Sequence, residues 1–124
     1  MFPRAFGDSD PMPISVTLVF AGKTVVLADP SGGTFDAAGD FDRLLPMENQ
    51  LPVQGAPDLP TLGRIDAYAD VEFSPDDMAA IRDEAVALLQ LAKPGPEARG
   101  LKRLRVLAEH GAQMPGAVLR VEAD

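Results

Sequence analysis

The stretch RIDAYADVEFSPDDMAAIRDEAVALLQL, residues Arg64–Leu91, decides the fold class because its apolar residues change their spacing at Ser74. Before Ser74, apolar and polar residues alternate strictly, which predicts a strand over Arg64–Phe73. After Ser74, apolar residues recur at helical spacing, which predicts a helix over about Pro75–Leu91, with Ser74 as its cap. The apolar stripe of this helix comprises Met78, Ile81, Ala85, Leu88, Leu89 and Ala92, and we assign Arg82, Asp83, Glu84 and Gln90 largely to other faces.

Toward the amino terminus, two further strands are predicted, because ISVTLVF (Ile14–Phe20) alternates and KTVVLA (Lys23–Ala28) follows it closely. The intervening Ala21-Gly22 predicts a tight hairpin turn. Toward the carboxyl terminus, KPGPEARG ends the first helix and begins a second. We expect Leu101, Leu104, Leu107 and Ala108 of this second helix to face inward, Gly111 to stop it, His110 to cap its end, and Ala117–Ala123 to form a final strand.

This order of elements, β-β-loop-β-α-α-β, predicts an α+β fold: a two-layer domain with a mostly antiparallel sheet of about four strands packed by two helices. The chain has 124 residues, of which 46% are hydrophobic and 24% charged. Such a chain can bury one core without metal or disulfide support. We therefore expect residues 1–124 to form a single domain, with residues 1–12 as a flexible amino-terminal segment.

A long connection rich in Pro, Gly and Asp spans residues 29–63, and its start, ADPSGGTFDAAGDFD, resembles a metal site in composition. Four aspartates lie there: Asp29, Asp36, Asp40 and Asp42. Counted from Asp36, the third position is Ala38 and the twelfth is Met47, so the spacing of a calcium-binding EF-hand loop is absent. Asp and Gly are also ordinary turn residues, and Asp40 is a candidate cap for a short helix over Phe41–Leu45. We predict no metal, and keep a looser calcium or magnesium site at these four aspartates as the alternative.

Charge and composition restrict the partners. Eleven basic against nineteen acidic residues give a net charge of −8, which disfavours nucleic acid and anionic membrane surfaces. The sequence has no cysteine, and neither a signal peptide nor a long apolar run is recognisable, so we expect a cytoplasmic location. Four cations do gather in ARGLKRLR, namely Arg99, Lys102, Arg103 and Arg105, which we interpret as the solvated face of the second helix.

Two classes of function remain. No catalytic signature is present, so we predict no catalytic residues and no cofactor. The first class is a small acidic, non-catalytic protein-binding module, for instance an inhibitor or immunity-type protein that covers a basic partner surface. Its candidate binding face on the third strand consists of Asp66, Tyr68, Asp70 and Glu72. The alternative is a small enzyme or ligand-binding domain that uses the Asp-rich loop and the acidic strand face.

Overall fold

The central strand, β1 (Ile14–Phe20), forms antiparallel pairs along both of its edges. One edge pairs with β7 (Val118–Ala123), which in turn pairs with β6 (Val71–Phe73). The other edge is shared by β2 (Lys23–Thr24) and β5 (Ala37–Gly39). The computed structural model describes residues 14–47, 53–66 and 68–123, so the expected flexible segment at residues 1–12 lies outside the described residues. Within those ranges, the predicted α+β domain with an antiparallel sheet is confirmed.

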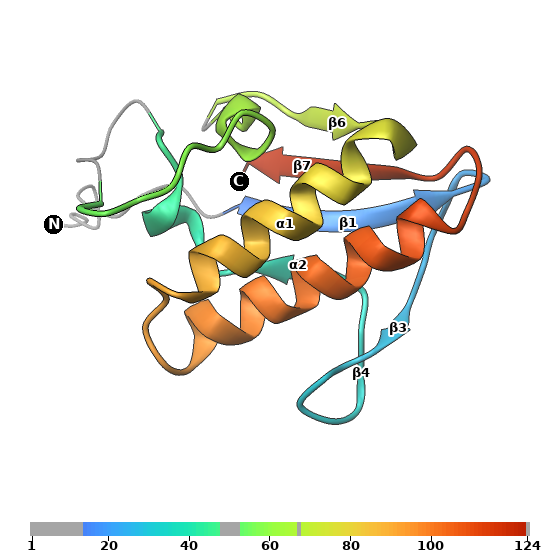
Figure 1. The fold of residues 1–124 in the computed structure, drawn as a ribbon. Coiled ribbons are helices and arrows are strands. Elements are labelled where there is room, and N and C mark those ends of the chain that lie inside the picture. The colour runs from blue at the N-terminus through green and yellow to red at the C-terminus, as the bar shows by residue number, and fades with distance from the viewer. Residues whose placement is uncertain (1–13, 48–52, 67, 124) are drawn as a thin grey trace, which may run out of the picture.

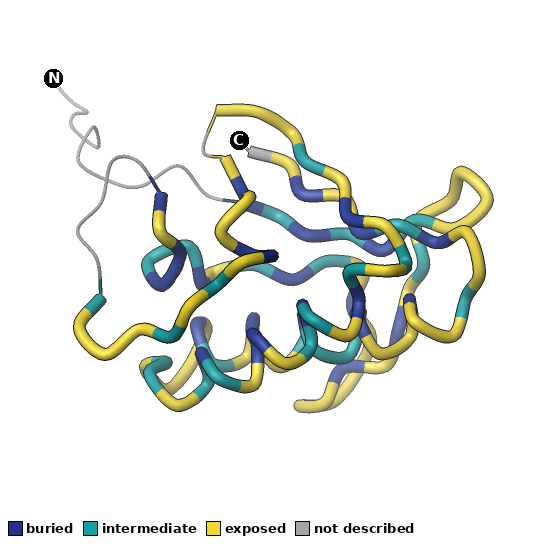
Figure 2. Tube along the Cα trace, turned by 45° about the horizontal axis from the view of Figure 1, so that its top comes forward, coloured by how far each residue is buried: buried dark blue, intermediate teal, exposed yellow. Residues whose placement is uncertain are grey.

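Two helices cover one face of the sheet (Figure 1). The first helix, α1 (Met78–Leu89), follows a 3-10 turn, η3 (Pro75–Asp77), and α2 (Pro96–Ala112) packs beside it. Figure 2 shows that buried residues concentrate between the helices and the sheet. The largest fully buried side chains come from both layers and from the connection: Val16, Leu18, Phe73 and Leu119 from the strands, Met78, Ile81, Leu88, Leu101, Leu104 and Leu107 from the helices, and Phe41 and Leu62 from the connection between β5 and β6. No described helix has the length and apolar character needed to cross a membrane.

The β1–β2 hairpin has the predicted turn, in which Ala21 and Gly22 both have positive φ angles, 54° and 77°. This combination suits the right-handed twist of the two strands. The predicted strand Lys23–Ala28 is nevertheless wrong in its extent, because it divides into β2 and β3 (Leu27–Ala28). Since β5 occupies the remainder of that edge of β1, β3 leaves the sheet and pairs with β4 (Thr34–Phe35).

The predicted strand Arg64–Phe73 is also too long. A 3-10 turn, η2, occupies Leu62–Arg64, and the strand β6 begins only at Val71. Between them, an isolated bridge joins Asp66 to Ala69, and the Asp66 carboxylate accepts a hydrogen bond from the backbone N–H of Tyr68 at 2.8 Å. This local bond closes a turn that competes with extended strand structure.

The connection over residues 29–63 contains more regular structure than predicted. It holds β4, β5 and the 3-10 turn η1 (Asp42–Leu44), while its residues 48–52 lie outside the described ranges. Asp40 does not cap η1: its φ is 71°, and Phe41 holds the capping position without a side-chain hydrogen bond. The burial of Phe41 in the core fixes this turn instead.

The carboxyl-terminal end of α2 differs from the prediction at Gly111. This glycine lies inside the helix and is buried, and a Cβ there would meet the Met78 side chain at 2.7 Å. Gly111 therefore allows α2 to approach its neighbours and does not stop the helix. His110 lies in the last turn as expected, with its Nδ1 3.1 Å from the Val106 carbonyl oxygen, but the capping position is held by Gln113.

Candidate protein-binding surface

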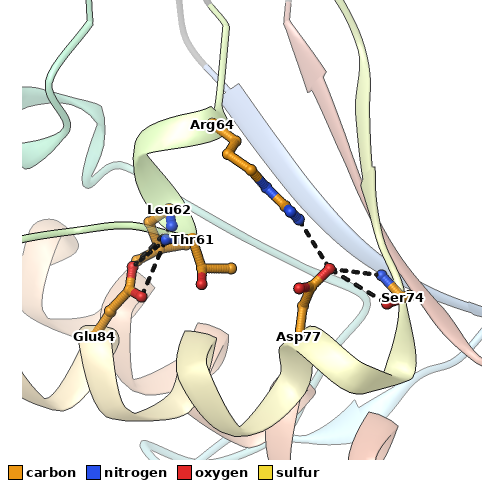
Figure 3. Close-up of polar contacts among 6 residues, drawn as sticks. All are labelled: Thr61, Leu62, Arg64, Ser74, Asp77 and Glu84. Carbon is orange, nitrogen blue, oxygen red and sulfur yellow. Dashed lines mark hydrogen bonds and ion pairs between the residues drawn. The ribbon is translucent and has the colours of Figure 1, made fainter.

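The acidic segment before and within β6 is fixed at its first end by Glu84, a carboxylate of α1 (Figure 3). The Glu84 side chain accepts a hydrogen bond from the backbone N–H of Leu62 at 2.8 Å, and its two oxygens lie 3.3 and 3.2 Å from the N–H of Thr61. These amides stand at the start of η2, where a helical turn has no internal acceptor for them. Glu84 is only 8% exposed, so it joins α1 to η2 within the interior.

The second end is fixed by Asp77 in η3 (Figure 3). Its Oδ2 accepts hydrogen bonds from Arg64 Nη2 at 2.8 Å, from the Ser74 backbone N–H at 3.1 Å and from the Ser74 hydroxyl at 3.3 Å. Desolvation of Asp77 opposes ionisation, but the bonds from Arg64 and Ser74 outweigh it and lower the pKa of this carboxyl. The Arg64 guanidinium also lies over the Phe73 ring, 4.7 Å from its centre. One carboxylate thus ties η2 to the end of β6.

Between these two attachments the chain exposes an aromatic side chain among carboxylates. Tyr68 is 59% exposed, and Asp66, Asp70 and Glu72 are exposed as well. None of these three carboxylates forms an ion pair with another of the described residues. We call Asp66, Tyr68, Asp70 and Glu72 the Tyr68 surface.

The structure places these four residues on one segment, but not on one strand face. Only Glu72 belongs to β6, and it points away from the helices because its neighbour Phe73 is buried beneath them. Asp66 and Tyr68 belong to the turn closed by their own hydrogen bond. The alternating sequence therefore identified exposed residues correctly while the predicted arrangement along a single strand was wrong.

Charge is concentrated around the same segment. Residues Arg64–Asp77 contain five acids and one arginine, which gives −4 of the net −8 of the chain. That one arginine is paired with Asp77. The segment therefore presents negative charge that can interact with a basic surface.

The four aspartates of the opening loop have separate environments. Asp29 is buried: its carboxylate accepts bonds from the Ser31 hydroxyl and backbone N–H, at 2.6 and 2.8 Å, and it forms an ion pair with Arg103. The Ser31 bonds are the main cause of its lowered pKa, with Arg103 contributing. Asp36 and Asp40 are exposed, while burial raises the pKa of Asp42. Within the described parts of the chain, no three His, Cys, Asp or Glu side chains converge as a metal-ion site would require.

Sequence reasoning missed Glu84, which was assigned to a polar face. A signal was present, because Glu84 lies three residues after Ile81 and four before Leu88, within the buried stripe of α1. A carboxylate at such a position needs hydrogen-bond donors from elsewhere in the fold, and the backbone of η2 supplies them. The identity of those donors depends on tertiary packing and could not be read from spacing.

In comparisons with known proteins, no family model, curated protein or solved structure matches this chain. The roles of its residues therefore rest on the contacts, burial and charges described above.

Proposed function

We propose that the protein is a small, non-catalytic protein-binding module that covers a basic surface of its partner, in the manner of an inhibitor or immunity-type protein. The observation that supports this function best is the exposed Tyr68 among carboxylates that have no described ion-pair partner. An exposed tyrosine supplies a large contact area, and aromatic residues are frequent energetic centres of interfaces.

The attachment of the segment at both ends supports the same proposal. Glu84 holds η2, and Asp77 holds Arg64 and Ser74, so both ends of the segment that bears the Tyr68 surface are held in place before any partner arrives. Ordering a loop during association reduces affinity, and a segment ordered in advance avoids part of that cost. The surrounding carboxylates would act mainly on the rate of association with a basic partner.

The test begins with capture from an extract of the source cells, using four immobilised forms: the unchanged protein, Tyr68→Ala, Asp66→Asn/Asp70→Asn and the control Phe20→Ala. Phe20 is a matched control because it is also an exposed aromatic residue but lies on β1, outside the Tyr68 surface. The proposal expects a protein that the unchanged protein and Phe20→Ala capture and that Tyr68→Ala loses.

Kinetics with that captured protein then separate contact from charge. We expect Tyr68→Ala to weaken affinity by about tenfold or more, as for an interface residue of large effect. Asp66→Asn/Asp70→Asn should mainly slow association and flatten its dependence on salt concentration. Capture that is equal in all four forms, or absent in all four while each remains folded, would contradict the proposal.

A further inference from the structure

A second surface of different chemistry lies where the β3–β4 hairpin meets the connection from α1 to α2. There the structure forms an open pocket with a volume of about 580 Å³. This is within the range of roughly 300–1,000 Å³ that is common for small-molecule sites. Half-buried Leu89, Ala92 and Ala98, together with Pro94, give the pocket an apolar wall.

Two cations border this apolar wall. Arg99 and Lys102 are three residues apart on α2, which places them on neighbouring positions of one helix face. Both are exposed, and neither side chain forms a hydrogen bond or ion pair with another described residue. This is notable in a chain of net charge −8, where acceptors for cations are plentiful.

The acid that lines the same pocket is already engaged. Asp29 lines the same pocket, but its carboxylate is held by Ser31 and paired with Arg103. Arg103 in turn lies over the Phe35 ring, 5.4 Å from its centre, and so belongs to the support of the hairpin. Arg99 and Lys102 are therefore the cations left for a molecule in the pocket.

We propose that this pocket binds a small amphipathic anion, with its carboxylate or phosphate head on Arg99 and Lys102 and its apolar body on Leu89, Ala92 and Ala98. Two cations beside an apolar wall select for both properties at once, since a charged group alone leaves the wall exposed to water and an apolar body alone leaves the cations unpaired. The inference does not depend on the Tyr68 surface, because it uses other residues and a ligand of opposite charge to the basic partner proposed there.

The experiment uses a pair of fluorescent probes that share their rings and differ in charge: anionic 8-anilinonaphthalene-1-sulfonate and neutral N-phenyl-1-naphthylamine. The anionic probe should bind the folded protein and shift the backbone amide NMR signals of Ser31, Gly95, Ala98 and Lys102. Arg99→Gln/Lys102→Gln should weaken its binding by about tenfold or more, while binding of the neutral probe stays unchanged. The matched control Lys23→Gln/Arg82→Gln, which removes the same charge from residues outside the pocket, should leave anionic-probe binding within about twofold.

Displacement then tests the head and the body of the ligand separately. Benzoate and phenyl phosphate should displace the probe, and the more effective of the two identifies the preferred head group. Inorganic phosphate, which lacks an apolar body, should displace it at least about tenfold less effectively than phenyl phosphate. The inference is overturned if the two double variants weaken the anionic probe equally, if the NMR shifts lie outside the pocket, or if inorganic phosphate competes as well as phenyl phosphate.

Discussion

Gly100 is a residue at which the two layers of the fold come into close contact. It is buried on the sheet-facing side of α2, where a Cβ would overlap the backbone carbonyl oxygen of Gly39 in β5 and crowd the Phe41 ring at 3.3 Å. Gly39 itself has little space, because a Cβ there would lie 2.8 Å from the Ile14 carbonyl oxygen. These two glycines let the helix rest directly on the strand backbone.

Alanine at Gly100 and at Gly111 should therefore have different effects. Gly100→Ala should lower the free energy of unfolding by about 1 to 3 kcal/mol or more, because backbone atoms cannot move aside easily. In Gly111→Ala the new methyl group contacts the flexible end of the Met78 side chain. Alanine also favours the helix by about 1 kcal/mol relative to glycine, which offsets this crowding. Urea unfolding of both variants measures the difference, and a Gly100→Ala variant at least as stable as Gly111→Ala would show that the layers are less closely packed.

At the scale of elements, carboxylates of α1 and η3 attach the irregular segment between η2 and β6 to the helical layer. Glu84 satisfies two amides of η2, and Asp77 joins Arg64 to Ser74. The turn that bears Tyr68 contributes few apolar contacts of its own, because Asp66, Tyr68 and Asp70 are all exposed. Its conformation therefore depends on these attachments to the helical layer.

Removal of the Glu84 carboxylate tests this dependence. Glu84→Ala should cost about 1 to 3 kcal/mol of stability, because the N–H groups of Thr61 and Leu62 lose their acceptor in a buried place. Hydrogen exchange at these two amides should also accelerate. The control Glu109→Ala, on the exposed face of α2, should change stability by less than about 0.5 kcal/mol. Equal urea midpoints for the two variants would argue against a structural role for Glu84.

The sequence predicts best the elements in which the periodic pattern of apolar residues continues over a long stretch. The strand β1 and both helices fall where alternation and helical spacing placed them. The strand β5 was missed because Ala37–Gly39 has low intrinsic strand preference, and it becomes a strand only through pairing with β1 and support from α2. The strand β6 likewise covers only the three residues of the acidic segment that pair with β7.

The candidate surfaces were predicted to different degrees. The exposure of Tyr68 and its acidic neighbours followed from their polar positions, because such residues are rarely buried without partners. The sequence also indicates the cluster of cations in ARGLKRLR, but it predicts one solvated face for all four of them. Only the fold shows that these cations have different surroundings. Arg103 pairs with Asp29, which lies in a turn far away in the sequence, whereas Arg99 and Lys102 border the pocket.

At the scale of the whole molecule, three ion pairs among the described residues join loops and 3-10 turns to the helical layer: Asp29 with Arg103, Arg43 with Glu97, and Arg64 with Asp77. The Arg43–Glu97 pair is bidentate, with distances of 3.0 and 2.8 Å, and the Lys93 backbone N–H also donates to Glu97. The hydrogen bond from Arg43 is the main cause of the lowered pKa of Glu97. All three carboxyls thus have folded-state pKa values below their ordinary values.

These lowered pKa values determine the direction of the pH dependence. A carboxyl with a depressed folded-state pKa stabilises the fold above its unfolded value, and this contribution is lost as pH falls through the folded value. The urea concentration at the unfolding midpoint should therefore stay nearly constant from about pH 7 to pH 5 and decrease below about pH 4.

The variant Glu97→Gln tests one of these carboxyls and should be less stable than the unchanged protein by about 1 to 3 kcal/mol at neutral pH. Between neutral and acidic pH, this variant should lose less stability than the unchanged protein does. An equally large loss in both proteins would exclude Glu97 as a source of the pH dependence.

The pairing of β1 with β7 has a consequence for the time course of folding. Its register runs from Ile14 opposite Ala123 to Val19 opposite Val118, so the centre of the sheet joins the two ends of the described chain. Contacts of such wide sequence separation require closure of a long loop before they stabilise anything, and they are associated with slow folding. During synthesis, β1 leaves the ribosome long before β7 exists. Throughout that interval the backbone edge of β1 that later pairs with β7 is open to strands of other chains, and pairing with β7 closes this route to aggregation.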